Sequence, residues 1–196
     1  MLDKIKSLSK QTLIYGTSTI VGRFLNFILV PFYTNVFPPS EYGIVAVVFA
    51  YIAFFNIIYS LGFEAGYFRF ASTNEIGNPK QNFSHPFFVI VANSAFLSLI
   101  ILIFSGNITS IIGLKDPSII FYTAFILFFD ALSLVPFANL RLKNKASLFA
   151  AIKLINITIN VTLNLIFILV FKYGLVAVFI SNFIASFITF LLLLPV

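Results

Sequence analysis

The sequence predicts an all-α membrane protein, built as a bundle of six transmembrane helices. Of its 196 residues, 60% are hydrophobic and only 9% are charged, whereas ordinary soluble domains carry roughly 25% charged residues. So few charges cannot cover a water-facing surface, and the mean hydropathy is +1.07. The apolar side chains must therefore face lipid as well as one another, and six apolar runs are long enough to cross a bilayer.

The first three helices are separated by turn-forming segments. The first is expected over residues 11–36, bent near Pro31. Its apolar run is far longer than a signal-peptide core, and no small-residue cleavage motif follows it. Ser40 and Glu41 resemble a helix start and predict a second helix over residues 42–70. A polar stretch around Gly77-Asn78-Pro79 then precedes a third helix over residues 86–104.

The second half of the chain repeats this alternation. A loop is expected over residues 105–117, followed by a fourth helix over residues 118–140. A basic turn at 141–145 leads to a fifth helix over residues 147–171, and a turn at 172–174 leads to a sixth over residues 175–194.

Lysine and arginine are distributed unevenly between the two predicted sides of the membrane. The richer side holds Lys4, Lys6, Lys10, Arg69, Lys80, Arg141, Lys143 and Lys145, and the other holds Lys115 and Lys172. The positive-inside rule places the richer side, and both ends of the chain, in the cytoplasm. The net charge of +6 then follows from topology signals, and we expect no nucleic-acid partner.

An even number of spans has a consequence for domain organisation. A second six-helix copy would insert in parallel, related to the first by an axis along the membrane normal. The chain stops directly after its last helix, without a polar tail. We therefore expect residues 1–196 to be the N-terminal lobe of a two-lobed transporter whose C-terminal lobe is missing here. A natural half-size protein is the alternative.

Polar side chains recur at membrane depth, where they are costly and face a cavity or a partner. Arg23 lies midway between Lys10 and Val36, roughly 20 Å from either helix end. The candidate cavity-lining residues occupy one stripe on the first helix and one on the fifth: Arg23, Asn26, Lys153, Asn156, Asn160 and Asn164. For Asn156, Asn160 and Asn164, cavity lining and interhelical hydrogen bonding are equally supported. Lys153 has a further alternative, which is to extend to the nearby cytoplasmic surface.

Two acidic residues are the candidates for ion coupling or ion pairing. Asp130 lies near mid-depth of the fourth helix, at a depth that would allow a buried pair with Arg23. Glu64 lies near the cytoplasmic end of the second helix, where pairing with Arg69 or with solvent is expected.

Enzymatic chemistry is not predicted. The chain has no cysteine and a single histidine, His85, so no metal site is expected. It lacks the phosphate-binding glycine motifs and the HExxH motif, so we expect no catalytic residue and no cofactor. A cavity lined by Arg23, Lys153 and asparagines suits a lipid-borne anion with many hydroxyls, such as a pyrophosphate-linked sugar lipid.

Several stretches resemble a known family. Residues Gly22–Thr34, Phe37–Gly43, Leu61–Ala65 and Tyr67–Phe70 are similar to the first helices of polysaccharide biosynthesis proteins. These are the O-antigen and capsule flippases of the multidrug/oligosaccharidyl-lipid/polysaccharide exporter superfamily. The resemblance covers essentially the whole chain but only one lobe of the family. Family members often carry a basic residue after the Tyr-Thr pair, where this chain has Asn35.

The resemblance implies a function. Flippases of this family carry an undecaprenyl-pyrophosphate-linked glycan across the bacterial inner membrane by alternating access. The expected partners are this lipid-linked glycan, membrane lipids, the C-terminal lobe and polysaccharide assembly proteins. In related lipid II flippases, cationic residues in the central cavity serve the substrate, and Arg23 matches such a position by approximate location.

Two alternatives stay open. A multidrug and toxin extrusion antiporter of the same superfamily would use acidic residues for cation coupling, and Asp130 and Glu64 would be its candidates. A non-transporting half-size membrane subunit belongs to a different class.

Overall fold

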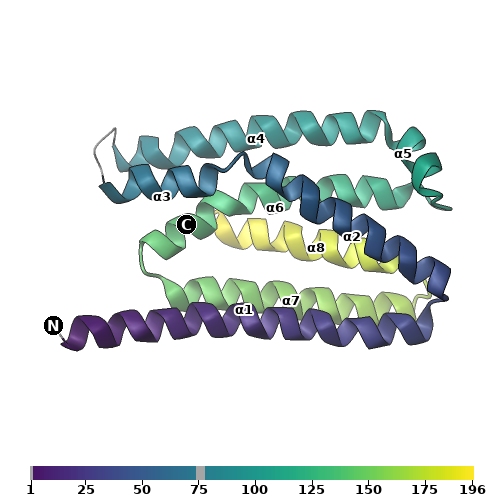
Figure 1. Cartoon of the computed structure of the whole chain (residues 1–196), viewed down its shortest axis with the longest axis horizontal. Coiled ribbons are helices and arrows are strands. Elements are labelled where there is room, and N and C mark those ends of the chain that lie inside the picture. The colour runs from purple at the N-terminus through teal and green to yellow at the C-terminus, as the bar shows by residue number, and fades with distance from the viewer. Residues whose placement is uncertain (1, 74–77) are drawn as a thin grey trace.

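A computed structural model describes residues 2–73 and 78–196 of the protein. Within these ranges the side chains of residues 2–10, 19, 22, 23, 25, 26, 72, 73 and 79 lie outside the description. The described residues form helices and no strand, which confirms the all-α membrane class (Figure 1). In chain order the helices are α1 (Leu2–Val36), α2 (Pro39–Ser60), α3 (Phe63–Thr73), α4 (Pro79–Ile103), α5 (Ser105–Ile112), α6 (Ser118–Leu142), α7 (Ala146–Leu169) and α8 (Val176–Leu193).

Among the described residues, five apolar helical segments are long enough to cross a membrane. They are Pro39–Ala71, Lys80–Ile103, Ser118–Leu142, Ala146–Leu169 and Val176–Leu193. In α1, the described apolar part is the shorter segment Phe27–Val36. The sixth span therefore stays a prediction, because several side chains of α1 lie outside the described residues.

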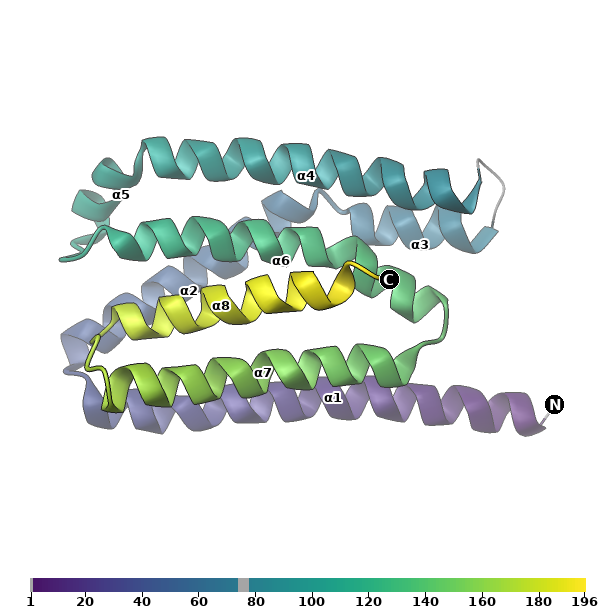
Figure 2. The ribbon, with the colours of Figure 1, turned by 180° about the vertical axis from the view of Figure 1, so that it is seen from behind.

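The centre of the bundle is α6, which packs against α2, α3, α4, α5, α7 and α8. Seen from behind, α4, α6, α8 and α7 follow one another, and α1 lies against α7 (Figure 2). Phenylalanines fill the contact between α6 and α8: the ring of Phe129 lies 5.0 Å from that of Phe187 and 5.6 Å from that of Phe190. Such close aromatic packing positions α8 along α6.

The expected helix over residues 42–70 is divided in two, which corrects the prediction. α2 ends at Ser60 because Leu61 and Gly62 both adopt left-handed backbone, with φ of 47° and 68°. The freed carbonyls of Ile58 and Tyr59 accept hydrogen bonds from Asn93 Nδ2 of α4, at 3.4 and 3.3 Å. The break is thus satisfied inside the protein, as membrane-depth backbone requires.

Two further boundaries differ from expectation. α4 begins at Pro79 and not at residue 86, because Asn78 and Gln81 form a capping box and proline suits the first helical turn. The short helix α5 replaces part of the expected loop at 105–117 and ends at Gly113, where φ is +73°. Left-handed backbone at that position favours glycine.

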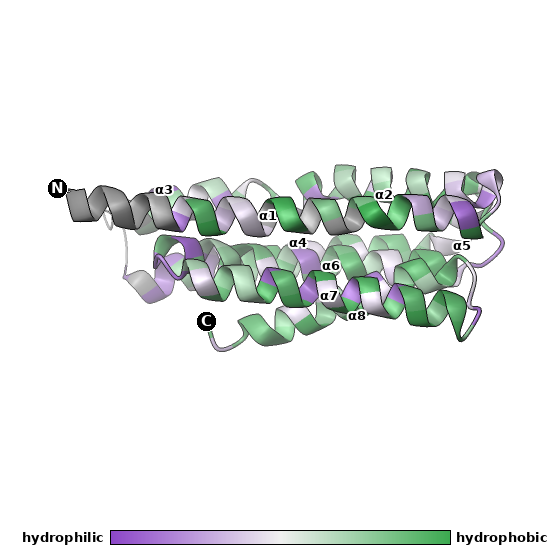
Figure 3. Cartoon of the chain, turned by 90° about the horizontal axis from the view of Figure 1, so that it is seen from below, coloured by the Kyte–Doolittle hydropathy of each residue, from purple (hydrophilic) through white to green (hydrophobic). Residues whose placement is uncertain are grey.

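The basic residues gather at one end of the bundle. Lys80 lies in the first turn of α4, and Arg141, Lys143 and Lys145 surround the connection from α6 to α7, at the end where α1 begins (Figure 1). Hydrophobic residues cover much of the helices, whereas hydrophilic residues interrupt α7 (Figure 3). We name the lysine-rich end the basic end.

The break between α2 and α3 generates a stability prediction. Asn93→Leu leaves two helix-end carbonyls at membrane depth without a donor, which should lower the free energy of unfolding by about 1–2 kcal/mol. Thermal unfolding in detergent, followed by circular dichroism, measures the change. Ser110→Ala is the control, because its hydroxyl bonds only to Gly106 of its own helix. Equal melting temperatures for the two variants would show that the hydrogen bonds from Asn93 do not stabilise the break.

Candidate functional site

A polar contact joins α7 to α8 at membrane depth. Asn156 Nδ2 of α7 donates a hydrogen bond to Thr189 Oγ1 of α8 at 2.8 Å. Thr189 in turn donates to the carbonyl of Ala185, at 2.8 Å. Asn156, a predicted cavity residue, is therefore used to hold two neighbouring helices together, as polar residues often are in membranes.

A second polar contact joins α1 to α7. Tyr33 OH donates to Asn164 Oδ1 at 2.8 Å, and Asn164 is fully buried. The Nδ2 atom of Asn164 donates to the side-chain oxygen of Asn160 at 2.6 Å, one helical turn away. Asn164 thus fixes α1 against α7 and orients the amide of Asn160.

A pocket of about 290 Å³ lies between α1 and α2, and we name it the α1–α2 pocket. α1 contributes Leu29, Val30 and Tyr33, α2 contributes Tyr42, Val45, Ala46 and Phe49, and the polar amides come from Asn160 of α7 and Asn182 of α8. Two amides in an otherwise apolar and aromatic lining give fixed donors and acceptors, which is the usual composition of a small-molecule site.

Two of the predicted site residues, Asp130 and Lys153, carry charge within the helix bundle. Asp130 Oδ1 of α6 accepts a hydrogen bond from Ser186 Oγ of α8 at 2.7 Å. Asp130 and Lys153 of α7 attract each other electrostatically. The ammonium of Lys153 also lies 4.4 Å from the ring centroid of Phe137, a cation–π distance. Asp130 thus places a negative charge in the part of the bundle that holds Lys153. The positive cavity stays a prediction, because the side chain of Arg23 lies outside the described residues.

The other predicted acid belongs to a different part of the bundle. Glu64 of α3 forms an ion pair with Arg141 of α6, where the sequence suggests Arg69 or solvent as its partner. The guanidinium of Arg141 lies 5.1 Å from the ring centroid of Phe68 and 5.8 Å from that of Phe149. This pair fastens α3 to α6 and does not line the α1–α2 pocket.

The predicted site residues are thus divided among several places. Asn160 lines the α1–α2 pocket, Asn164 supports it, and neither Lys153 nor Asp130 is among the lining residues. The side chains of Arg23 and Asn26 lie outside the described residues. Among the described residues, no group of three histidine, cysteine, aspartate or glutamate side chains could hold a metal ion.

Three polar residues of the pocket are absent from the set predicted from the sequence: Tyr33, Tyr42 and Asn182. Both tyrosines stand in apolar surroundings, where they resemble membrane-interface aromatics. A buried tyrosine needs a partner for its hydroxyl, and that requirement is the one clue that the sequence contains to the role of Tyr33.

The comparison with known proteins decides the family. The family model described as polysaccharide biosynthesis protein matches residues 34–196. The chain belongs to the polysaccharide biosynthesis protein family. The match includes the pocket residues on α2, α7 and α8, and it begins just after Tyr33 on α1. A search of the curated proteins and a search of the solved structures give no match.

The contact between α1 and α7 generates a second prediction. Tyr33→Phe removes the hydroxyl that donates a hydrogen bond to Asn164. The buried side-chain oxygen of Asn164 then lacks one donor, so the free energy of unfolding should fall by about 1–2 kcal/mol. Tyr173→Phe is the control, because Tyr173 is half exposed (50%). Thermal unfolding in detergent checks both, and a Tyr33→Phe protein as stable as the control would show that the bond is not needed.

Proposed function

We propose that the protein is a flippase that carries a lipid-linked oligosaccharide of the undecaprenyl-pyrophosphate type across the bacterial cytoplasmic membrane, for surface polysaccharide synthesis. The observation that carries the proposal is the amide-lined α1–α2 pocket inside a membrane bundle of the polysaccharide biosynthesis family. Hydroxyl-rich ligands need such groups, because lipid offers them no hydrogen bonds.

The lining of the pocket suits a sugar. The amides of Asn160 and Asn182 can each donate and accept, which matches the mixed hydrogen bonding of sugar hydroxyls. Tyr33, Tyr42 and Phe49 add apolar surface on the facing helices. A volume of about 290 Å³ is at the lower end of small-molecule sites, so the pocket would contact one part of a longer glycan.

The packing of α1 and α2 supports alternating access. α1 packs mainly on α7, whereas α2 packs mainly on α6, and the two helices contact each other little. The gap between them can therefore widen without breaking either main contact. In our proposal the basic end faces the cytoplasm, this chain is the N-terminal lobe, and the pocket opens toward a C-terminal lobe. The transport step uses an ion gradient or the gradient of the lipid itself.

The charges favour this proposal over a cation-coupled extruder. An acid that binds a coupling cation has to be accessible to it, yet Asp130 accepts a hydrogen bond from Ser186, and Glu64 is paired with Arg141. A cation at Glu64 would have to displace Arg141.

The pocket amides provide the direct test. Asn160→Ala with Asn182→Ala, expressed in a flippase-deficient strain, should reduce surface polysaccharide roughly 5- to 10-fold, which corresponds to the loss of one or two hydrogen bonds. Lipid-linked precursor should accumulate, while the protein level in the membrane stays constant. Asn107→Ala, at an exposed position of α5, is the matched control. A double variant that restores wild-type polysaccharide would refute the proposed role of the pocket.

Variants of Asp130 and Lys153 distinguish an electrostatic role of Asp130 from a role in ion coupling. Asp130→Asn alone leaves the half-buried Lys153 unbalanced, which should cost roughly 1–3 kcal/mol of stability. Adding Lys153→Met removes that imbalance, so the double variant should recover stability and most of the transport. A double variant that folds as well as the wild-type protein but transports nothing would instead give Asp130 a coupling role.

A further inference from the structure

The hydrogen bonds beside the α1–α2 pocket run in one direction, from α1 into α7. Tyr33 OH donates to Asn164 Oδ1 at 2.8 Å, and Asn164 Nδ2 donates to Asn160 Oδ1 at 2.6 Å. Asn164 Nδ2 also donates to the backbone carbonyl of Asn160, at 2.9 Å. Tyr33 and Asn160 line the pocket, whereas Asn164 is fully buried and is not among its lining residues. Asn164 therefore acts on the pocket only through the two residues that it bonds to.

One backbone group decides the direction of these bonds. The carbonyl of Asn160 can only accept, so the Asn164 atom that bonds to it must be the amide nitrogen. The same nitrogen bonds to the Asn160 side chain, and the bonded atom of that side chain must therefore be its oxygen. The other polar atom of Asn164 is its oxygen, so Tyr33 has to donate to it. A reversed Asn164 amide would instead place two acceptors against each other without a proton between them.

The direction determines what two of the lining residues offer to a ligand. The oxygen of the Asn160 side chain already accepts from Asn164, so the amide nitrogen is the group free to bind. Tyr33 uses its one proton on Asn164, so its oxygen can only accept from a ligand. No charged residue is among the described residues that line the pocket. The pocket thus presents a fixed donor and a fixed acceptor in neutral surroundings.

We propose that Asn164 is a positioning residue for the ligand of the α1–α2 pocket. It sets the arrangement of donor and acceptor so that a sugar hydroxyl accepts a hydrogen bond from Asn160, and a hydroxyl can donate one to Tyr33. A hydroxyl suits both residues because it donates and accepts without charge. Hydrogen bonds that point in one direction also strengthen one another in surroundings of low dielectric constant. The inference rests on the proposed function, which supplies the class of ligand.

Binding of methyl β-D-glucopyranoside to the purified protein in phosphatidylcholine nanodiscs tests this role. Ligand-observed NMR measures the binding, and empty nanodiscs are the blank. At each hydroxyl of the probe, a deoxy derivative removes both donor and acceptor, whereas a deoxyfluoro derivative keeps a weak acceptor. A hydroxyl that accepts from Asn160 should therefore tolerate fluorine better than hydrogen. At one position or more, the fluoro derivative should bind roughly 3-fold more tightly than the deoxy derivative.

Three variants attribute this fluoro preference. Tyr33→Phe with Asn164→Leu removes both members of the buried pair, so the melting temperature should be retained while Asn160 is freed to rotate. The fluoro preference should then fall below about 1.5-fold at one of these positions. Tyr33→Phe alone should keep the preference, because the carbonyl of Asn160 still fixes Asn164. Asn156→Leu with Thr189→Val is the matched control, because it removes another interhelical asparagine bond of α7 outside the pocket, and it should keep the preference.

The outcomes are distinct. Loss of the fluoro preference in the double variant alone, with an unchanged melting temperature, supports the positioning role. A double variant that keeps the preference would overturn it, and so would equal binding of fluoro and deoxy derivatives by the wild-type protein. Loss of the preference together with a lower melting temperature, or in the control variant as well, would assign Asn164 a structural role and overturn it too.

The glucoside itself separates this inference from the flippase proposal. If the unmodified glucoside binds but the fluoro preference is missing or independent of Asn164, the positioning role fails and the sugar pocket stands. Wild-type protein that does not bind the glucoside would refute the sugar pocket, and the positioning role with it.

Discussion

A polar group inside a bilayer must find its partner within the protein, and this constraint holds the helices of this chain together. The contacts of α7 with α8, of α6 with α8, of α1 with α7 and of α4 with α6 each contain at least one such bond. Ser186 of α8 donates to Asp130 of α6, Asn156 of α7 donates to Thr189 of α8, and Tyr33 of α1 donates to Asn164 of α7. On the other side of α6, Tyr59 of α2 bonds to Ser98 of α4, which in turn donates to the carbonyl of Ala124. Apolar packing alone specifies helix register weakly in lipid, so these bonds select one arrangement.

The same constraint separates structural amides from those available to a ligand. The side chains of Asn156 and Asn164 form hydrogen bonds with neighbouring helices. Asn160 of α7 and Asn182 of α8 line the α1–α2 pocket. Residues on one face of α7 therefore differ in their surroundings, since Asn156 and Asn164 bond to neighbouring helices. The asparagines differ because each turn of α7 meets different neighbours. Asn156 faces α8, whereas Asn160 faces the α1–α2 pocket.

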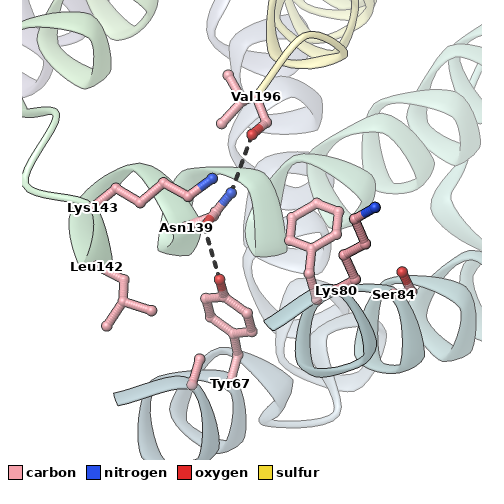
Figure 4. Close-up of a pocket in the computed structure, with 9 residues that line it drawn as sticks. Tyr67, Lys80, Ser84, Asn139, Leu142, Lys143 and Val196 are labelled. Atoms are coloured by element: carbon pink, nitrogen blue, oxygen red, sulfur yellow. Dashed lines mark hydrogen bonds between the residues drawn. The ribbon is translucent and has the colours of Figure 1, made fainter. Parts of the chain in front are cut away.

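Two pockets lie toward opposite ends of the helix bundle. The α1–α2 pocket includes Tyr33, near the end of α1, and Tyr42, in the first turn of α2, so it lies toward the end with few basic residues. The other pocket, of about 370 Å³, lies at the basic end between α3, α4 and α6, where Lys80 and Lys143 line it (Figure 4). The proposed flippase would have to handle a charged linkage and a hydroxyl-rich glycan, and the two pockets differ in their charged and polar lining residues. The chain's membership of the polysaccharide biosynthesis family agrees with such a cargo.

The sequence by itself determined the fold class, the family, the positions of the apolar segments and the concentration of lysines at one end. Composition and hydropathy suffice for these, because every residue of a span contributes to the same energy of transfer into lipid. Only the tertiary structure decided that the helix over 42–70 breaks at Leu61 and Gly62, because the break depends on Asn93 of another helix. It also decided that Glu64 pairs with Arg141 and that Tyr33 meets Asn164, which lies 131 residues away. Such partners are set by helix packing, and local sequence contains no record of which faces will meet.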